Sequence, residues 1–301
     1  MNRIISKTKF NFRLTKENQA GILFTMPFLI GFLAFSLIPM GMSFYYSFSK
    51  YDILSPPRWV GLKNYVDMVS DKTMWQSLGV TLFYSFVSGP LRMATALVVA
   101  MLLFRNGKVV AIFRAVYYLP SIIGGSVAIA VLWKRMFASD GVINGILNTL
   151  GVSVTYSWIG GENTAIWTLI ILSVWQFGSA MLIFLAGLKQ IPISLYEAAM
   201  VDGVGRWKRF TRITLPMLSP TIFFNLIMQV ITGFMAFTQS FLITEGKPLN
   251  RTLFYMVYVY NQSFKYYNMG YGAALSWFMI LIVGTITILL FKTQKYWVYE
   301  E

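Results

Sequence analysis

The chain contains no cysteine and no histidine, and only 12% of its 301 residues are charged. Disulfides, thiol chemistry and the usual zinc and haem ligands are therefore excluded, and with them most metal-dependent and histidine-based catalysis. No G-x-x-x-x-G-K-[ST] loop is present either, because Gly107-Lys108 and Gly246-Lys247 lack both the upstream glycine and the following hydroxyl residue. We expect no cofactor and no metal in this chain, so that any ATP that drives it is hydrolysed by another chain.

Hydrophobic residues are in excess, at 56% of the sequence, which is outside the range of soluble globular domains. They form runs long enough to cross about 30 Å of hydrocarbon, which takes roughly 20 helical residues. The runs are continuous rather than alternating, and this favours helices. Six spans are predicted, at 22–48, 78–104, 109–133, 164–188, 217–243 and 270–291. The sequence thus predicts an all-α membrane protein with six transmembrane helices.

Positive charge is distributed unevenly between the predicted loops. If residue 1 is cytoplasmic, the segments on that side hold 15 of the 25 Lys and Arg residues, and the tail 1–19 alone carries five of them. Because positive loops favour the cytoplasmic side, both termini are predicted to be cytoplasmic, with 20–301 forming a single transmembrane domain. Topology and anionic membrane lipid account for most of the net charge of +14, and nucleic acid is not an expected partner.

A polar loop, 189–216, separates the fourth and fifth predicted spans. Ser194 and Glu197 have the spacing of a capping box, which predicts a helix that begins near Leu195. Gly203 suits the left-handed position that ends such a helix. An ordinary helix-turn-helix connection would explain these features equally well.

The order of residues in this loop is more specific than its composition. From Glu197 to Pro216 it runs Glu-Ala-Ala, three residues, Gly, nine residues, then Ile-x-Leu-Pro. This pattern resembles the signature of the permease subunits of binding-protein-dependent ABC importers, and Asp202 before Gly203 makes it most similar to the carbohydrate branch, the maltose and glycerol-phosphate type. Val204 departs from the alanine usual there. Four further segments resemble sequences of this family and occur in the same order, at 60–65, 113–120, 140–144 and 270–276.

The resemblance implies a type I ABC-importer permease fold in the bacterial cytoplasmic membrane. It implies half of a translocation pathway for a sugar or oligosaccharide, opened by alternating access. It also implies partners: a second homologous permease, two ATP-binding subunits that hold ATP and magnesium, and an extracytoplasmic solute-binding protein. The residues expected to contact the ATP-binding subunit are Glu197, Ala198, Ala199, Asp202 and Gly203, with the two alanines leaving the helix surface bare enough for close approach.

Polar and small residues in two spans are candidates for the substrate pathway. In the fifth span they recur every three or four residues and so form one stripe on a helix, and in the fourth span they cluster. Amides pair with sugar hydroxyls and an indole stacks on a sugar ring; the alternative is that these residues only pack helices together. Ala236 and Ser240 continue the stripe of the fifth span. The candidates are Asn225, Gln229 and Gly233 in the fifth span, and Trp175, Gln176 and Ser179 in the fourth.

Arg92 stands near the centre of the second span, just after Gly89-Pro90. A cation there costs about 2.5–3.5 kcal/mol on insertion scales, so something must compensate for it. Three explanations are open: the side chain snorkels to the interface; it pairs with backbone carbonyls freed around Pro90 or with the partner permease; or it is a fixed positive charge beside the pathway, suited to the carboxylates of an acidic oligosaccharide.

The segment 252–268 carries seven Tyr and Phe residues in seventeen positions. An aromatic belt at the membrane interface is the favoured interpretation, and a sugar-stacking surface at the outer gate is the alternative.

Two other function classes compete with an importer subunit. A secondary transporter or channel that works without an ATPase predicts titratable residues for ion coupling, and Arg92 is the only one placed inside a span. An intramembrane enzyme would need a catalytic base in a span, and no His, Asp or Glu is found there.

Overall fold

A computed structural model describes residues 16–299, and most of the predicted tail 1–19 lies outside this range. Three helices are long and apolar enough to cross a membrane, and three bent helix pairs pass the same test together, which makes six spans if each pair is one span. The predicted all-helical membrane architecture is confirmed. The cytoplasmic placement of the termini stays a prediction.

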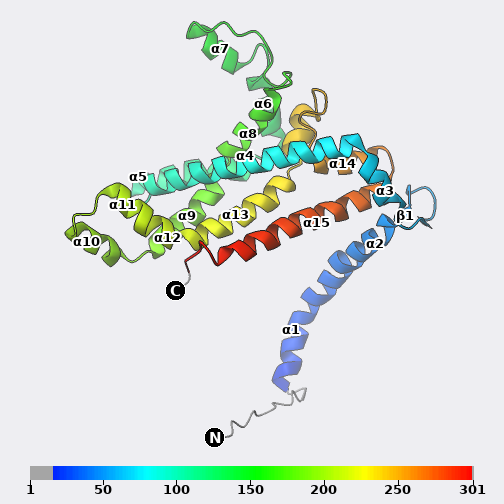
Figure 1. Ribbon diagram of the computed structural model, residues 1–301, viewed down its shortest axis with the longest axis horizontal. Coiled ribbons are helices and arrows are strands. Elements are labelled where there is room, and N and C mark those ends of the chain that lie inside the picture. Colours follow the sequence, from blue (N-terminus) through cyan, green and yellow to red (C-terminus); the bar gives the residue numbers. More distant parts are fainter. Residues whose placement is uncertain (1–15, 300–301) are drawn as a thin grey trace.

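The first span is a continuous helix that packs against the rest of the chain only at its far end. It consists of α1 (Lys16–Phe32), the π-helical turn η1 (Leu33–Leu37) and α2 (Ile38–Ser47). α2 packs against α15 (Met269–Gln294), whereas α1 points away from the other helices (Figure 1). The apolar side chains of α1 are exposed in the single chain, as expected for a helix that faces lipid or another subunit.

The centre of the molecule is α4 (Lys72–Leu102), an unbroken helix of 31 residues. It packs against the fourth and fifth spans and against the short helix α14 (Tyr255–Tyr260). Gly233 of the fifth span makes this packing close, because a Cβ there would lie 2.8 Å from Ser85 Oγ of α4.

Three spans are broken rather than straight. α5 (Lys108–Ile123) and α6 (Val127–Met136) meet at 98°, α8 (Ala165–Trp175) and α9 (Gly178–Gln190) at 41°, and the helical run Arg206–Met217 and α13 (Ser219–Phe234) at 65°. The first bend follows Pro120 and falls at Gly124-Gly125, close to the kink that the proline predicts. The helical run Arg206–Met217 consists of α11 (Arg206–Arg209), η2 (Phe210–Thr214) and α12 (Leu215–Met217).

The predicted end of the fifth span at residue 243 is wrong. α13 stops at Phe234, and after a non-helical stretch a separate π-helical turn, η3 (Ser240–Thr244), follows. Hydrophobic runs do not record a break of this kind, because apolar residues continue through it. The predicted stripe of polar and small residues therefore does not lie on one helix.

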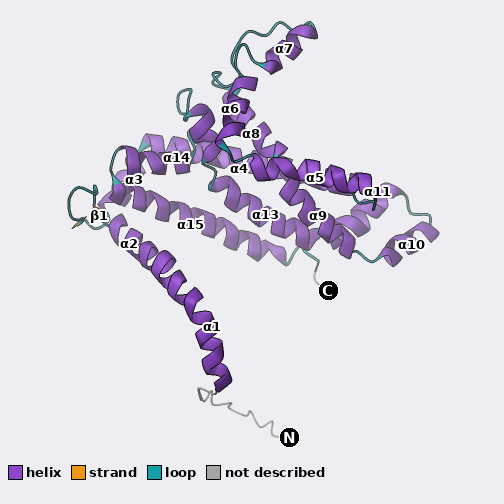
Figure 2. Cartoon of the chain, turned by 180° about the vertical axis from the view of Figure 1, so that it is seen from behind, coloured by secondary structure: helices purple, strands orange, loops and turns teal. Residues whose placement is uncertain are grey.

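Short elements complete the end of the bundle away from the polar loop 189–216, as both views show (Figures 1 and 2). They include α3 (Lys63–Ser70), a two-residue antiparallel pairing of β1 (Ser49–Lys50) with β2 (Arg58–Trp59), and η4 (Asn261–Lys265). The connection between α6 and α8 carries the short helix α7 (Val142–Thr149). Asp71 lies between α3 and α4. Its carboxylate accepts hydrogen bonds from the backbone amides of Thr73 and Met74 and from the hydroxyls of Tyr258 and Tyr271.

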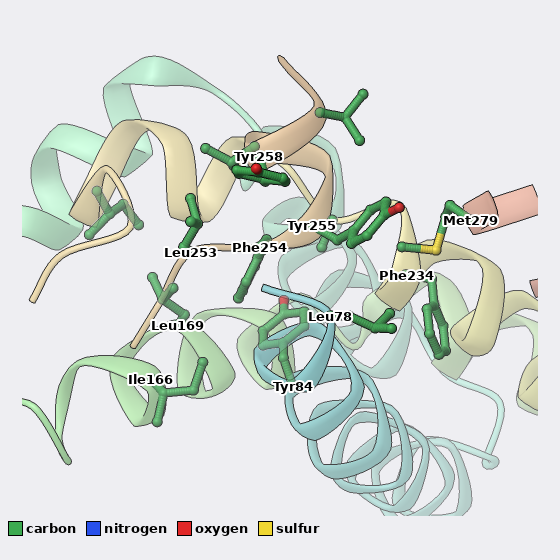
Figure 3. Close-up of a cluster of buried hydrophobic side chains, with 14 of the residues drawn as sticks. Leu78, Tyr84, Ile166, Leu169, Phe234, Leu253, Phe254, Tyr255, Tyr258 and Met279 are labelled. Carbon is green, nitrogen blue, oxygen red and sulfur yellow. The ribbon is translucent and has the colours of Figure 1, made fainter. Parts of the chain in front are cut away.

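The interfacial-belt prediction for 252–268 is wrong for the first part of the segment. Phe254 and Tyr255 are fully buried and Tyr258 nearly so, in a cluster with α4, α8, α13 and α15 (Figure 3). Phe254 packs on Tyr84 with ring centroids 4.5 Å apart. The chain folds back between the spans here, which a one-dimensional count of aromatic residues cannot show. Only the later aromatic residues, from Tyr260 onwards, are exposed.

Candidate functional site

The polar loop 189–216 carries α10 (Ile193–Val201), a helix that starts earlier than the capping box predicts. Pro192 has extended backbone angles and helical geometry begins directly after it at Ile193, so Ser194 already lies in the first turn. A capping side chain must come from a residue with non-helical angles. The capping-box prediction is therefore wrong, and no side-chain cap is formed at this end.

The other end of α10 is built as predicted. Gly203 has φ +69°, and its amide donates to the Met200 carbonyl while the Val204 amide donates to the Ala199 carbonyl. These two hydrogen bonds form a Schellman motif, in which the left-handed residue is usually glycine because a Cβ is strained there. Space is not the constraint, since no atom lies within 4 Å of a Cβ built on Gly203.

The surface of the loop differs from the prediction at one alanine. Glu197, Ala198, Asp202 and Gly203 are exposed, but Ala199 is buried against its own chain. The loop instead exposes apolar side chains that the sequence reasoning passed over, namely Met200, Val201 and Trp207. Large apolar residues in a charged loop outside the hydrocarbon would have been the signal for them, because such a patch marks an interaction surface. The hydroxyls of Tyr196 and Thr214 lie 2.8 Å apart and tie α10 to η2.

A polar cavity lies between α4, the junction of α8 with α9, and the end of α13. Its volume is about 180 Å³. Hydroxyl, amide and guanidinium groups from three spans converge on it, although the surrounding helices are apolar. Its lining consists of Tyr84, Ser88, Arg92, Ser173, Gln176, Gln229, Thr232, Gly233, Ala236 and Gln239.

Arg92 is held in this cavity by a broken helix. α8 ends at Trp175, which leaves the Gln176 carbonyl without its helical partner, and Arg92 Nε donates to that oxygen at 2.9 Å. Ser121 Oγ donates to the same oxygen, also at 2.9 Å. The carbonyl that pairs with Arg92 therefore comes from the fourth span, whereas the hypothesis placed it in the turn around Pro90. Within residues 16–299 no carboxylate lies within 4 Å of Arg92.

Comparison with known proteins identifies this arrangement of spans. Residues 93–297 match the family described as "Binding-protein-dependent transport system inner membrane component". The chain belongs to this family. It is a multi-pass ABC transporter permease, a membrane transport component, and the permease fold predicted from the loop signature is confirmed.

Several relatives of this permease cover nearly its whole length. It is 52% identical to the probable ABC transporter permease protein YesP of Bacillus subtilis (strain 168), over 96% of this chain and 94% of that protein. It is 33% identical to the trehalose/maltose transport system permease protein MalF of Thermococcus litoralis, over 98% of both. The arabinooligosaccharides transport system permease protein AraP of Bacillus subtilis is 32% identical, over 92% of this chain and 88% of that protein.

A solved structure has the same fold as this permease. It is a bacterial ABC transporter involved in the import of the acidic polysaccharide alginate, with a TM-score of 0.80 over 93% of this chain and 96% of that one. The identity is 22%, so the match shows the fold alone.

The structure brings together four of the predicted pathway residues and leaves three outside. Arg92, Gln176, Gln229 and Gly233 all line the cavity of the permease. The amide of Gln176 also donates to the Gly124 carbonyl, at the break between α5 and α6.

Trp175, Ser179 and Asn225 do not line the cavity. Trp175 packs on Trp133, with ring centroids 5.8 Å apart, and Ser179 is exposed beyond the helix break. Asn225 is buried in α13 one turn before Gln229, and its amide donates to the Thr221 carbonyl of the same helix. For Trp175 and Asn225 the packing explanation is therefore the better one.

Of the two other stripe residues, only Ala236 reaches the cavity. Ser240 is buried in η3 and donates to the Thr252 carbonyl.

Sequence reasoning missed the polar face of the second span. Tyr84, Ser88 and Arg92 follow one another at intervals of four residues, so all three point to one side of α4 and into the cavity. This spacing was visible in the sequence. Gln239 could not be assigned in the same way, because it lies beyond the break after Phe234, which decides the direction of its side chain.

Proposed function

We propose that this permease is the transmembrane subunit of an ATP-driven importer of oligosaccharides and forms half of its translocation pathway. The cavity around Arg92 carries the proposal, because hydroxyls, amides and one guanidinium converge there at the junction of broken spans. Polar groups inside hydrocarbon are costly and mark substrate pathways. The names of the relatives, which include transport systems for trehalose/maltose and for arabinooligosaccharides, support a sugar as the cargo.

The substrate class that suits this cavity is an acidic oligosaccharide. The Nε–H of Arg92 is used by the Gln176 carbonyl, and its two terminal amino groups are the ones that can pair with a carboxylate in two parallel hydrogen bonds. Gln229, Thr232 and Gln239 supply donors and acceptors for sugar hydroxyls. A second, homologous permease supplies the opposite wall of the pathway.

ATP hydrolysis belongs to two separate ATP-binding subunits that hold ATP and magnesium. The exposed part of α10 around Glu197 and Gly203, with Val201 and Trp207 beside it, offers them a surface of charged and apolar groups. The loop leads directly from α9 into the run that ends at α13. A movement of the loop is therefore transmitted to the fourth and fifth spans, which border the cavity.

The remaining parts of the proposal concern placement and delivery. The importer lies in the bacterial cytoplasmic membrane with the loop 189–216 and both termini in the cytoplasm. An extracytoplasmic solute-binding protein delivers the substrate to the opposite end, which carries α3, α14 and η4.

Purification of the tagged chain from a strain that expresses its neighbouring transport genes tests the proposal. An ATP-binding subunit and a second permease should co-purify, and reconstituted vesicles should take up an oligosaccharide only with ATP and the solute-binding protein. Uptake that follows an ion gradient without any ATPase would instead indicate a secondary transporter.

A further inference from the structure

A second concave surface lies near the end of the permease opposite the loop 189–216. It is a groove of about 610 Å³ between η3, with the turn after it, and α14 with η4. Its lining alternates aromatic rings with charged groups. The lining includes Phe241, Glu245, Lys247, Tyr260, Phe264 and Lys265.

The aromatic residues of this groove form a continuous series. Phe237 stacks on Phe241 with centroids 4.8 Å apart and nearly parallel planes, and Phe241 meets the ring of Tyr260 at 5.1 Å. Tyr260 in turn lies 5.3 Å from Phe264. The series ends in solvent, since Tyr260 is 38% exposed and Phe264 56% exposed.

These exposed rings contribute little to the core. The neighbouring Phe254 and Tyr255 are fully buried and already fill the space beneath the segment. Tyr260 and Phe264 pack on each other, and the exposed part of each ring is open to a ligand. An amphipathic ring with one free face is the surface on which a sugar ring stacks.

One short segment of the chain contributes residues to both the groove and the polar cavity around Arg92. Ala236 and Gln239 line the cavity, whereas Phe241 and Leu242, two and three residues after Gln239, line the groove.

The charged residues of the groove favour a ligand that carries an acidic group. Lys247 and Lys265 line the groove together with a single acid, Glu245, and the Lys247 ammonium lies 3.5 Å from the Glu245 carboxylate. Lys265 forms no ion pair within residues 16–299; its ammonium lies 5.8 Å from the centroid of the Tyr266 ring. One cation is therefore left for a carboxylate of the ligand.

We propose that this groove is an entry subsite, in which a sugar ring of the incoming oligosaccharide stacks on Tyr260 and Phe264 and its carboxylate meets Lys265 before the substrate moves to the Arg92 cavity. The inference rests on the proposed import function. It adds a second binding position, outside the cavity, and the residues that form it.

Cysteine labelling tests the subsite directly, because the chain has no cysteine of its own. Phe264→Cys and Tyr266→Cys each place one thiol in the same segment, at positions 56% and 54% exposed, and only the first lines the groove. The assembled importer, held with ATP in the absence of the solute-binding protein, is treated with a membrane-impermeant maleimide. Trigalacturonate is the acidic probe and maltotriose the neutral one.

Trigalacturonate should slow the labelling of Phe264→Cys several-fold and leave the labelling rate of Tyr266→Cys unchanged. Maltotriose should protect Phe264→Cys less than trigalacturonate does. Equal labelling with and without either sugar would overturn the subsite. So would complete protection of Phe264→Cys in the sugar-free importer, because another subunit would then cover the groove.

Transport supplies the second measurement. Phe264→Ala should lower the uptake rate of the imported probe about two- to tenfold, as expected for the loss of one stacking face, while Tyr266→Ala transports normally. If the wild type imports a probe and Phe264→Ala is unaffected, the subsite is wrong and the import function stands. If the wild type imports neither probe, the proposed substrate class itself fails.

Discussion

The side chain of Arg92 on α4 donates its Nε–H to the carbonyl of Gln176, 84 positions along the chain, at 2.9 Å. That carbonyl is available because α8 ends one residue earlier, and Ser121 of α5 donates to it as well. One backbone oxygen thus joins three spans, and it sets the guanidinium into the wall of the cavity.

Arg92→Gln should abolish the preference for acidic substrates. Glutamine can still donate to the Gln176 carbonyl, but it cannot offer the paired charged donors that a carboxylate binds best. We expect uptake of trigalacturonate to fall at least about tenfold, which corresponds to roughly 1.4 kcal/mol, and uptake of a neutral trisaccharide to change much less. Both rates can be measured in the same vesicles. An equal loss for the two sugars would make Arg92 a structural residue.

Gln229→Ala should weaken transport without weakening the complex. Gln229 lines the cavity and is partly exposed, so one hydrogen bond to a sugar hydroxyl is lost, worth about 0.5–1.5 kcal/mol. Uptake should therefore fall several-fold. Asn225→Ala is the matched control, because Asn225 is buried one turn away on the same helix and its amide bonds only to that helix. Asn225→Ala should lower thermal stability more than uptake. The reverse pattern would assign Gln229 to helix packing.

Gly203→Val should uncouple the permease from its ATPase. A β-branched residue at φ +69° costs about 1–2 kcal/mol or more, because the left-handed conformation that closes the Schellman motif is strained for it. The end of α10 should therefore shift while the spans stay folded. Co-purification of the ATP-binding subunit and ATP-driven uptake are the measurements.

Gly205→Val is the control for this variant. Gly205 has extended backbone angles, φ −65° and ψ 159°, and no atom lies within 4 Å of a Cβ built on it. Valine adopts these angles without strain, so Gly205→Val should retain the ATPase. Full uptake by Gly203→Val would mean that this turn does not take part in docking.

Asp71 should make stability dependent on pH at the end of the permease away from the loop 189–216. Burial acts to raise the pKa of Asp71, but hydrogen bonds from Tyr258, Tyr271 and the amides of Met74 and Thr73 outweigh it and hold the pKa below its ordinary value. A carboxyl whose pKa is lowered by folding stabilises the folded state above its ordinary pKa, and this contribution is lost as the pH falls through the lowered value.

Asp71→Asn tests this prediction while keeping a side-chain oxygen for the cap of α4. The thermal stability of wild type and variant in detergent should differ most above about pH 5, begin to converge near about pH 4, and become equal only once the pH has fallen through the lowered pKa of Asp71. Tyr258→Phe should reduce the same difference, because it removes one of the hydrogen bonds to the carboxylate. A gap between wild type and Asp71→Asn that stays constant across this range would show that the charge of Asp71 does not matter.

Local sequence determined the membrane class, the approximate positions of the spans and the turn at Gly203. A span needs a minimum run of apolar residues to cross the hydrocarbon, and a left-handed turn needs glycine or a close substitute. Both features therefore depend on residues that are adjacent in the sequence. The signature of the permease family likewise lies within twenty consecutive positions, from Glu197 to Pro216.

Tertiary structure decided what the polar residues inside the spans contact. Gln176 and Trp175 are adjacent in the sequence, yet the break after α8 sends one into the cavity and the other against Trp133. The end of α13 at Phe234 likewise separates Ala236 and Ser240 from the stripe that a straight helix would form. A helix break changes the direction of every side chain beyond it, and its position depends on contacts such as Arg92 with the Gln176 carbonyl, which join residues far apart in the chain.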